Sequence, residues 1–258
     1  MTIGNRTLKR TLTGAALACS LLAAGTVAAQ SVDPEADALL RKMSDYIASM
    51  EVFSLEAEVS QEEMFDSGQK VMFIKQAQAA VKRPDKLRIA RQGMVVDQEM
   101  FFDGKSLTLF GKRVGLYAAV PAGPTIEAVM DFARDGLGLD IPAADLLSGN
   151  AYSILMSDVL SGQYVGATII DGVLCHQLAF RGGDTDWQIW IDDGARPLPR
   201  KYVITSRWIT GAPQYTLDFK QWHLNPAVTD STFQFTPPEG SAEIEFLAVI
   251  DAPRKQLN

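Results

Sequence analysis

The spacing of hydrophobic positions changes once near the start of the chain, at about residue 51. Before that point apolar residues recur every three or four positions, which is the period of an amphipathic helix. Asp33 suits the N-cap of this helix and Pro34 suits its first turn. The helical apolar positions are Ala36, Leu39, Leu40, Met43, Ile47 and Met50.

From Phe53 onward apolar and polar residues alternate, so one face of each segment is apolar, as in strands packed on a core. Breaks such as Asp103-Gly104 and Asp171-Gly172 separate these segments, and Asp-Gly between apolar runs is typical of hairpin turns. With no crossover helices between them, the strands are expected to form an antiparallel meander. The predicted strands are 53–64, 69–82, 86–92, 95–103, 106–111, 113–119, 163–170, 173–182, 185–193, 199–209 and 214–224.

The alternation stops between residues 124 and 160, where the apolar spacing becomes helical again. One apolar helical face runs from Ile126 to Leu137, and glycines end it. Pro142 starts a second helical stretch that continues to Val159. No linker-like composition divides the chain, so residues 30–258 are predicted to form a single mainly β domain with helices.

A sheet of about eleven antiparallel strands cannot stay flat, because each strand adds roughly 20° of twist. The sheet should curl into an incomplete barrel, with the 124–160 insert as a helical lid over its concave face. A tightly packed lid would make an ordinary core, and a loosely packed one an apolar ligand cavity. The candidate cavity-lining residues are Phe73, Met100, Phe102, Met130, Phe132, Leu155, Met156, Trp187, Ile189, Trp208 and Phe219.

The segment Lys82-Arg83-Pro84 breaks the strand pattern with a cation. Proline lacks the N–H that a sheet ladder needs, so the chain must turn here and Arg83 must lie at the rim of the sheet. A guanidinium with five N–H donors can hold a covering element in place. It can equally be a rim charge that pairs with Asp85 or Asp131. We expect a latch to reach backbone carbonyls of residues 124–160.

The N-terminal 29 residues have the layout of a cleaved secretory signal, with basic residues, an apolar run and a small-residue end. Cys19 lies in a poor context for lipoprotein attachment. Cleavage would change the formal net charge from −7 to −10 and leave Cys175 as the only cysteine. We therefore expect a periplasmic protein that does not bind nucleic acid, contains no disulfide and has no transmembrane segment in its mature chain.

Residue types that carry catalysis or bind metals are sparse. Cys175 and His176 are neighbours on a strand, so their side chains point to opposite faces and cannot cooperate. No zinc-ligand spacing, nucleophile motif or phosphate-binding loop is found. Asp184 and Asp186 are interpreted as hairpin-turn residues. The sequence therefore predicts no enzyme activity, no catalytic residue, no metal and no cofactor.

Three short motifs together resemble periplasmic lipoprotein carriers of the LolA type. They are Lys82-Arg83-Pro84, Phe102-Asp103-Gly104-Lys105-Ser106-Leu107 and Phe233-Gln234-Phe235-Thr236-Pro237-Pro238-Glu239-Gly240. The segments Trp190-Ile191-Asp192 and Leu198-Pro199-Arg200-Lys201 are similar to a related group of predicted periplasmic proteins that carries only a domain-of-unknown-function label, and this group is the closer match.

The resemblance implies an open curled β-barrel whose apolar cavity takes acyl chains, and it assigns Arg83 the role of the latch that holds the lid shut. A lipid or an acylated protein would be the ligand, with a membrane-bound partner for hand-over. The alternative is a non-enzymatic sensor of the cell envelope that docks a membrane-bound regulator through its convex face. The fold alone does not decide between these functions.

Overall fold

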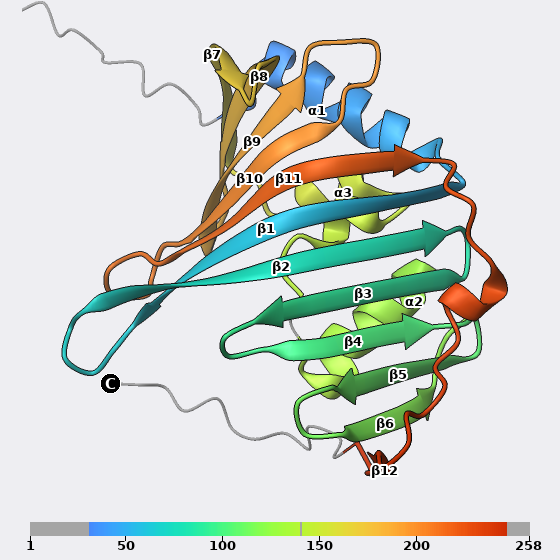
Figure 1. Ribbon diagram of the computed structural model, residues 1–258. Helices are drawn as coiled ribbons and strands as arrows, with labels where there is room; N and C mark the ends of the chain where they lie inside the picture. Colours follow the sequence, from blue (N-terminus) through green and yellow to red (C-terminus); the bar gives the residue numbers. More distant parts are fainter. Residues whose placement is uncertain (1–30, 140, 247–258) are drawn as a thin grey trace, which may run out of the picture.

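The computed structural model describes residues 31–139 and 141–246, so the predicted signal segment and Cys19 lie outside the described residues. Within these residues twelve strands form one curled sheet (Figure 1). The strands are β1 Val52–Met64, β2 Lys70–Lys82, β3 Lys86–Gly93, β4 Asp97–Phe102, β5 Ser106–Gly111, β6 Leu116–Pro121, β7 Ser161–Ile170, β8 Val173–Arg181, β9 Thr185–Asp192, β10 Pro199–Ser206, β11 Gln214–Leu224 and β12 Ala242–Glu243.

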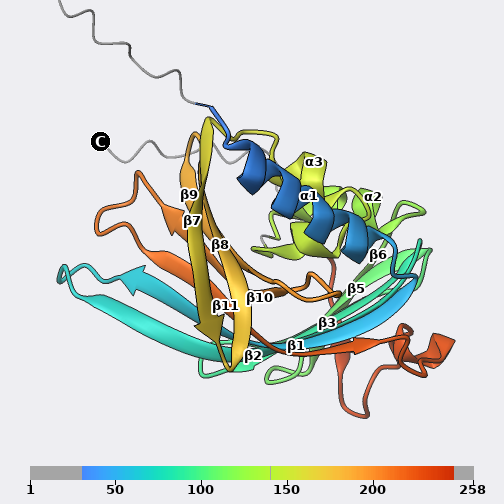
Figure 2. The same cartoon turned by 90° about the horizontal axis from the view of Figure 1, so that it is seen from above.

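Two antiparallel meanders make up the sheet, in the order β12-β6-β5-β4-β3-β2-β1-β11-β10-β9-β8-β7. The pairing of β1 with β11 joins the meanders, and the ends of the sheet do not meet. Seen from above, the two wings enclose a concave side (Figure 2). The predicted incomplete barrel of antiparallel strands is therefore confirmed. The short β12, which pairs in parallel with β6, was not predicted.

Each of the eleven predicted strands is present, with small differences at the ends. The predicted strand 199–209 is too long at its end, because β10 ends at Ser206 and residues 207–213 form a loop. The strand predicted from residue 113 begins only at Leu116, after a turn in which Gly115 has a φ of 66°. A positive φ suits glycine, which has no Cβ to clash.

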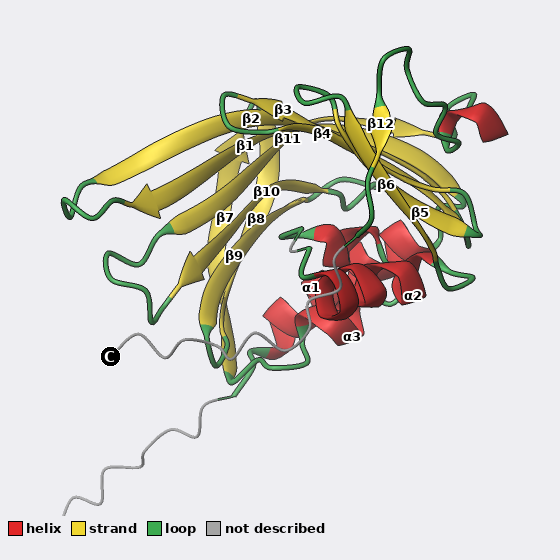
Figure 3. Cartoon of the chain, turned by 90° about the horizontal axis from the view of Figure 1, so that it is seen from below, coloured by secondary structure: helices red, strands yellow, loops and turns green. Residues whose placement is uncertain are grey.

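Four helical elements and a π-helical turn cover the concave face (Figure 3). Asp33 caps the first helix as predicted, with its side chain accepting a hydrogen bond from the Glu35 amide. The 124–160 insert is helical but more broken than predicted. The elements are α1 Pro34–Ala48, α2 Ile126–Asp131, the π turn Phe132–Gly136, the 3-10 helix η2 Ala144–Leu147 and α3 Ala151–Leu155. No described helix is both long and apolar enough to cross a membrane.

The hydrophobic core lies between these helices and the inner face of the sheet. Leu40, Met43 and Ile47 of α1 are fully buried, and Ile126 and Val129 of α2 are fully buried as well. Fully burying such a side chain stabilises the fold by roughly 1.5–3 kcal/mol. The helices are therefore part of the core and not only an addition to its surface.

The C-terminal segment packs on the convex face of the sheet. Phe235 lies against three aromatic rings of β4, β5 and β6, namely Phe101, Phe110 and Tyr117, with centroid separations of 5.4, 5.2 and 5.0 Å. Phe233, two residues earlier, is fully buried. This aromatic cluster covers the outer face of the wing whose inner face carries α2.

We expect Phe235→Ala to lower the free energy of unfolding by about 2–3 kcal/mol, somewhat less than for a fully buried phenylalanine. Urea denaturation would measure this. The matched control is Trp208→Ala, because Trp208 is also a large aromatic residue but is 73% exposed. The control should cost less than about 1 kcal/mol. Equal losses in the two variants would contradict the structural role of the aromatic cluster.

Candidate functional site

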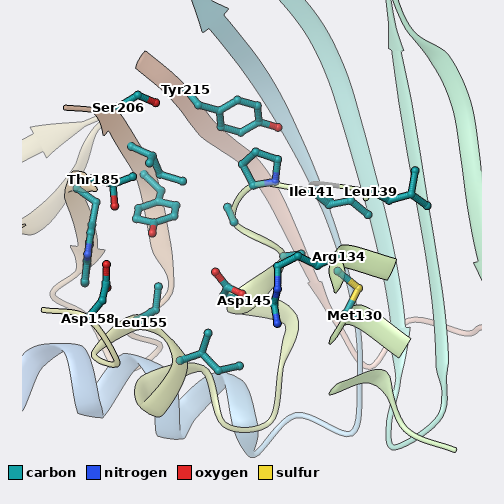
Figure 4. A pocket seen from close by; sticks show the side chains of 17 residues that line it. Met130, Arg134, Leu139, Ile141, Asp145, Leu155, Asp158, Thr185, Ser206 and Tyr215 are labelled. Carbon is teal, nitrogen blue, oxygen red and sulfur yellow. The ribbon is translucent and has the colours of Figure 1, made fainter. Parts of the chain in front are cut away.

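A cavity of about 340 Å³ lies between the helical insert and the second wing of the sheet. Trp187 of β9, Tyr202 of β10 and Tyr215 of β11 line it from the sheet, and Met130 and Leu155 line it from the helices (Figure 4). The cavity exists because β9, β10 and β11 curl away from the short helices opposite them. Its volume falls in the range typical of small-molecule sites, about 300–1,000 Å³.

A narrower hollow of about 50 Å³ continues along the concave face toward β1 and β3. It shares the segment Ile141–Ala144 and Tyr215 with the larger cavity, so these residues form the wall between the two. Aliphatic side chains such as Leu55, Ile89 and Leu217 line the narrow hollow. A ligand that passed this wall would find an almost wholly apolar surface.

The larger cavity also has a polar side. Asp145 of η2 and Asp158, which follows α3, line it together with Tyr202. Burial raises the pKa of Tyr202, and the charges of Asp145 and Asp158 raise it further. Arg134 also lines the cavity, but its guanidinium donates to Asp131 at 2.6 Å and to Asp135 at 3.1 Å. The cavity therefore combines apolar walls with a cluster that favours a neutral tyrosine.

Several of the sequence-predicted residues lie at these hollows. Met130, Leu155 and Trp187 line the large cavity, and Phe219 lines the narrow one. Met100 borders a hollow of about 10 Å³, which is too small for more than a methyl group.

Four other predicted residues belong to the packed interior. Phe102 and Ile189 are fully buried within the core, and Phe132 and Met156 are half-buried against it. Period-two alternation places a residue on the inner face, but it does not say whether helices pack directly on that residue.

Two predicted residues lie elsewhere. Trp208 does not face the interior as expected, because it is 73% exposed in the loop after β10 and donates to the Gly183 carbonyl at 3.1 Å. The prediction assumed that β10 continued to residue 209. Phe73 is on the inner face of β2, but its ring packs in a tilted orientation beside that of Phe65, with centroids 6.3 Å apart, away from the described hollows.

Other cavity residues were not predicted. Ile141 belongs to an irregular stretch with no hydrophobic period that could have revealed its position, and it borders all three hollows. Asp145 and Asp158 were not singled out, because no motif or spacing in the sequence marks them. For Tyr215 the alternation along β11 gives a usable signal, since it shares a face with Leu217 and Phe219.

Arg83 lies at the turn between β2 and β3, where three parts of the chain meet. Its Nε donates to the Met50 carbonyl just after α1, at 3.2 Å, and its Nη1 is 3.9 Å from Oε1 of Glu127 in α2. The side chain is only 13% exposed. The same Glu127 oxygen accepts from the Gly149 amide at 2.8 Å and the Ser148 hydroxyl at 3.2 Å.

The predicted contact between Arg83 and backbone carbonyls of residues 124–160 is therefore wrong in its detail. The carbonyl that Arg83 reaches belongs to Met50, and its contact with the insert is an ion pair with Glu127. The alternative partners, Asp85 and Asp131, are not used. A backbone bond runs in the opposite sense, because the Pro84 carbonyl accepts from the Ile126 amide at 2.9 Å.

A separate hollow, of about 490 Å³, lies at the edge strands β7 and β8 and is lined by residues such as Gln163, Gln188 and the Arg181–Asp186 pair. No residue of α2, η2 or α3 lines it. It is larger than the cavity beneath the insert, and among the described residues it is lined by strands β7, β8 and β9 and by Ser31.

One polar cluster outside the cavities is centred on His176. His176 is held between the Tyr164 hydroxyl at 3.1 Å and the Asp193 carboxylate at 2.6 Å. In residues 31–139 and 141–246, no group of three or more histidine, cysteine or acidic side chains is placed to hold a metal ion.

Comparison with known proteins identifies the family. Residues 36–247 match the family described as predicted periplasmic protein (DUF2092), and the chain belongs to this family. The resemblance to a domain-of-unknown-function group and the periplasmic localisation that it implied are thereby confirmed. No curated protein matches the chain.

Solved structures with a similar chain path have low sequence identity. An uncharacterised conserved protein from Thermus thermophilus has 10% identity and a TM-score of 0.48, over 82% of this chain and 99% of that one. LprF from Mycobacterium bovis has 14% identity and a TM-score of 0.47, over 82% and 100%. MucB has 14% identity and a TM-score of 0.47, over 79% and 64%.

The Glu127 cluster predicts a pH dependence. Burial alone would raise the pKa of Glu127, but hydrogen bonds from Gly149 and Ser148 and the charge of Arg83 outweigh it, so the pKa is lowered. A lowered pKa adds stability above the unfolded value of about 4.3, which is lost as the pH falls through the folded value. Glu127→Gln should therefore destabilise the protein at pH 7 and make less difference in acid.

Urea denaturation of wild type and Glu127→Gln between pH 7.5 and 3.5 would measure this. Glu239→Gln, which changes an exposed carboxylate, is the matched control. A stability difference that is the same at both ends of the pH range would contradict the role given to the ionised Glu127.

Proposed function

We propose that residues 30–258 act as one domain that binds an acyl chain or lipid in the periplasm, between the helical insert and the sheet. Binding and release take place without chemistry, so the domain acts as a carrier and not as an enzyme. The observation that supports this proposal best is the cavity of about 340 Å³ beneath the insert and its apolar continuation behind Ile141–Ala144.

The affinity comes from burial of the chain, at about 0.8 kcal/mol for each methylene group removed from water. The narrow hollow alone holds little, because its volume is about 50 Å³. A longer chain fits when Ile141–Ala144 moves and the two hollows merge. In this proposal the form in which Ile141–Ala144 separates the two hollows is the closed form, and ligand binding shifts the population toward an open one.

The contacts that Arg83 makes with Met50 and Glu127 form a cluster, called here the Arg83 cluster, that biases the protein toward the closed form. It connects the rim of the sheet to the end of α1 through Met50 and to the insert through Glu127. Yet Nη2 of Arg83 is buried without a hydrogen-bond partner among the described residues. A buried unpaired donor costs about 1–3 kcal/mol, so the closed cluster is only moderately favoured and a carrier can still open.

Filling the cavity tests the proposal directly. Ser206→Trp places a large side chain in the cavity from β10, and it should reduce binding of a neutral fluorescent apolar probe, N-phenyl-1-naphthylamine, by about tenfold or more. The matched control is Thr205→Trp, which adds the same side chain to the opposite face of β10.

Equal probe binding by the two variants would contradict a ligand site beneath the insert. Wild-type protein that neither binds the probe nor yields lipid on solvent extraction would favour the alternative, a sensor that docks a protein through its convex face.

The latch is tested by lipid retention. Arg83→Leu removes both the bond to Met50 and the ion pair with Glu127, so it should favour the open form and raise the fraction of protein purified with bound lipid. Native mass spectrometry would measure that fraction. Lys82→Leu is the control, because Lys82 pairs with Asp230 outside the cavity. Equal lipid occupancy in the two variants and wild type would end the latch proposal.

A further inference from the structure

The turns along one rim of the sheet expose large apolar side chains. In an antiparallel meander every second turn lies at the same rim, so the β1–β2, β3–β4 and β5–β6 turns lie together (Figure 1). Gln61 near the end of β1 pairs with Tyr215 near the start of β11, which places the loop 207–213 at this rim as well. The exposed side chains of these turns, called here the apolar rim, are Phe65, Met94, Val95, Val114, Trp208 and Ile209, each between 47% and 73% exposed.

The turns of the opposite rim have a different composition. They include Arg83-Pro84-Asp85, Asp103-Gly104-Lys105 and Asp171-Gly172, and these three segments contain no large aliphatic or aromatic residue. A single exposed apolar residue is ordinary on a protein surface, whereas a group of them on one side indicates an interaction site.

The β1–β2 hairpin projects beyond its neighbours at the apolar rim. The pairing of β1 with β11 ends at Gln61 and that of β2 with β3 ends at Lys75, so among the described strands residues 62–74 pair only with each other. A two-stranded hairpin alone is at best marginally stable in water. This one also exposes Met72 and Ile74, so contact with an apolar phase would stabilise it.

The cavity beneath the insert reaches the same rim. Thr185 begins β9, Ser206 ends β10 and Tyr215 is the second residue of β11, and all three line the cavity (Figure 4). Trp208 of the apolar rim follows Ser206 by only two residues. The apolar rim therefore borders one end of the proposed ligand site.

Charges of both signs accompany the apolar rim. Arg113 donates to the carbonyls of Met94 at 2.7 Å and Gly93 at 3.0 Å, so these two partners are not carboxylates. Asp66 is exposed in the β1–β2 turn. A zwitterionic lipid headgroup offers a phosphate to the cation and an ammonium to the anion. The whole chain has a formal net charge of −7, which disfavours a strongly anionic surface.

The spacing of the exposed residues suits a fluid surface better than a protein. Neighbouring strands lie about 4.8 Å apart, so successive turns on one rim are about 10 Å apart. Polar residues such as Lys70 and Lys112 separate the apolar side chains along the chain. A protein partner would need a separate pocket for each turn, whereas a lipid layer accepts each side chain independently.

We propose that the apolar rim docks on the surface of a lipid bilayer with zwitterionic headgroups. Its side chains insert among the lipids, and Trp208 lies at the interface, where tryptophan is favoured. An acyl chain then passes between the bilayer and the cavity at Thr185 and Ser206 without crossing water. This route rests on the proposed function, whereas docking itself does not.

Sedimentation of the mature protein with phosphatidylcholine vesicles tests the inference. Ile209→Ser should lower the partition coefficient by about tenfold, because it removes one inserted side chain. The matched control is Ile169→Ser, the same change at a residue that is 68% exposed beside the Asp171-Gly172 turn of the opposite rim. The control should change the partition coefficient by less than about twofold.

Quenching by brominated phosphatidylcholine locates the contact. The acyl-chain bromines should quench tryptophan fluorescence in wild type, and most of this quenching should disappear in Trp208→Phe. This variant keeps an aromatic side chain in the loop and should still sediment with vesicles. Quenching that persists in Trp208→Phe would contradict docking through the apolar rim.

The outcomes separate the inference from the proposed function. Wild type that binds N-phenyl-1-naphthylamine but not the vesicles, or equal losses in Ile209→Ser and Ile169→Ser, would overturn the inference and leave the proposed function standing. Vesicle binding that depends on Ile209, without probe binding, would support docking while the carrier proposal fails. Self-association that Ile209→Ser abolishes, in the absence of vesicle binding, would assign the apolar rim to a second copy of the chain and overturn the inference.

Discussion

The shape of this protein depends on the pairing of β1 with β11. These strands belong to different meanders, and nine paired positions from Phe53–Leu224 to Gln61–Tyr215 join them. A bulge between Glu56 and Ala57 interrupts the register, and bulges increase the local bend and twist. Because of this contact the two wings share one concave face. Without it, the sheet residues of the large cavity and those of its apolar continuation would belong to separate sheets.

Burial and not ion pairing holds the helical insert on that face. Ile126, Val129 and Leu146 are each at most 1% exposed, and each contributes roughly 1.5–3 kcal/mol when fully buried. The contact of Arg83 with Glu127 spans 3.9 Å and is partly exposed, so it is worth about 1 kcal/mol or less. The Arg83 cluster therefore fixes the position at which the insert packs on the sheet. A ligand that displaces the insert must replace the apolar contacts of the insert.

The fold could be predicted from the sequence because its main signals are local. Alternation identified the strands, and turns such as Asp171-Gly172 need only a few neighbouring residues, with Gly172 at a φ of 80°. The pairing of β1 with β11 was not predictable in this way, since about 160 residues separate the partners. Which strand pairs with β1 depends on how all the other strands pack, and no short stretch of sequence contains that information.

The candidate site was only partly predictable for the same reason. Met130, Leu155 and Trp187 were found because they lie on regular apolar faces. Glu127 was missed as the partner of Arg83 because Asp85 and Asp131 are equally plausible until α2 is placed. Trp208 was misplaced because alternation continued past the true end of β10.

The insert itself explains how such a cavity can open. Helices α2 and α3 have six and five residues, far below the about 12–15 at which an isolated helix becomes even marginally stable in water. Their structure is therefore maintained by contact with the sheet and with α1. The Tyr152 hydroxyl of α3 donates a hydrogen bond to Asp37 of α1. The Arg41 guanidinium of α1 lies over the Tyr152 ring, 3.8 Å from its centroid.

The 15-residue α1, capped by Asp33 and buried along one face, can stay in place while shorter elements shift. The smallest movement that merges the two hollows is that of Ile141–Ala144, which forms the wall between them. An acyl chain in that position would replace the apolar contacts of Ile141 with its own methylene groups. The burial lost by the wall is then recovered by the ligand, so the cavity can lengthen without exposing the inner face of β1 to water.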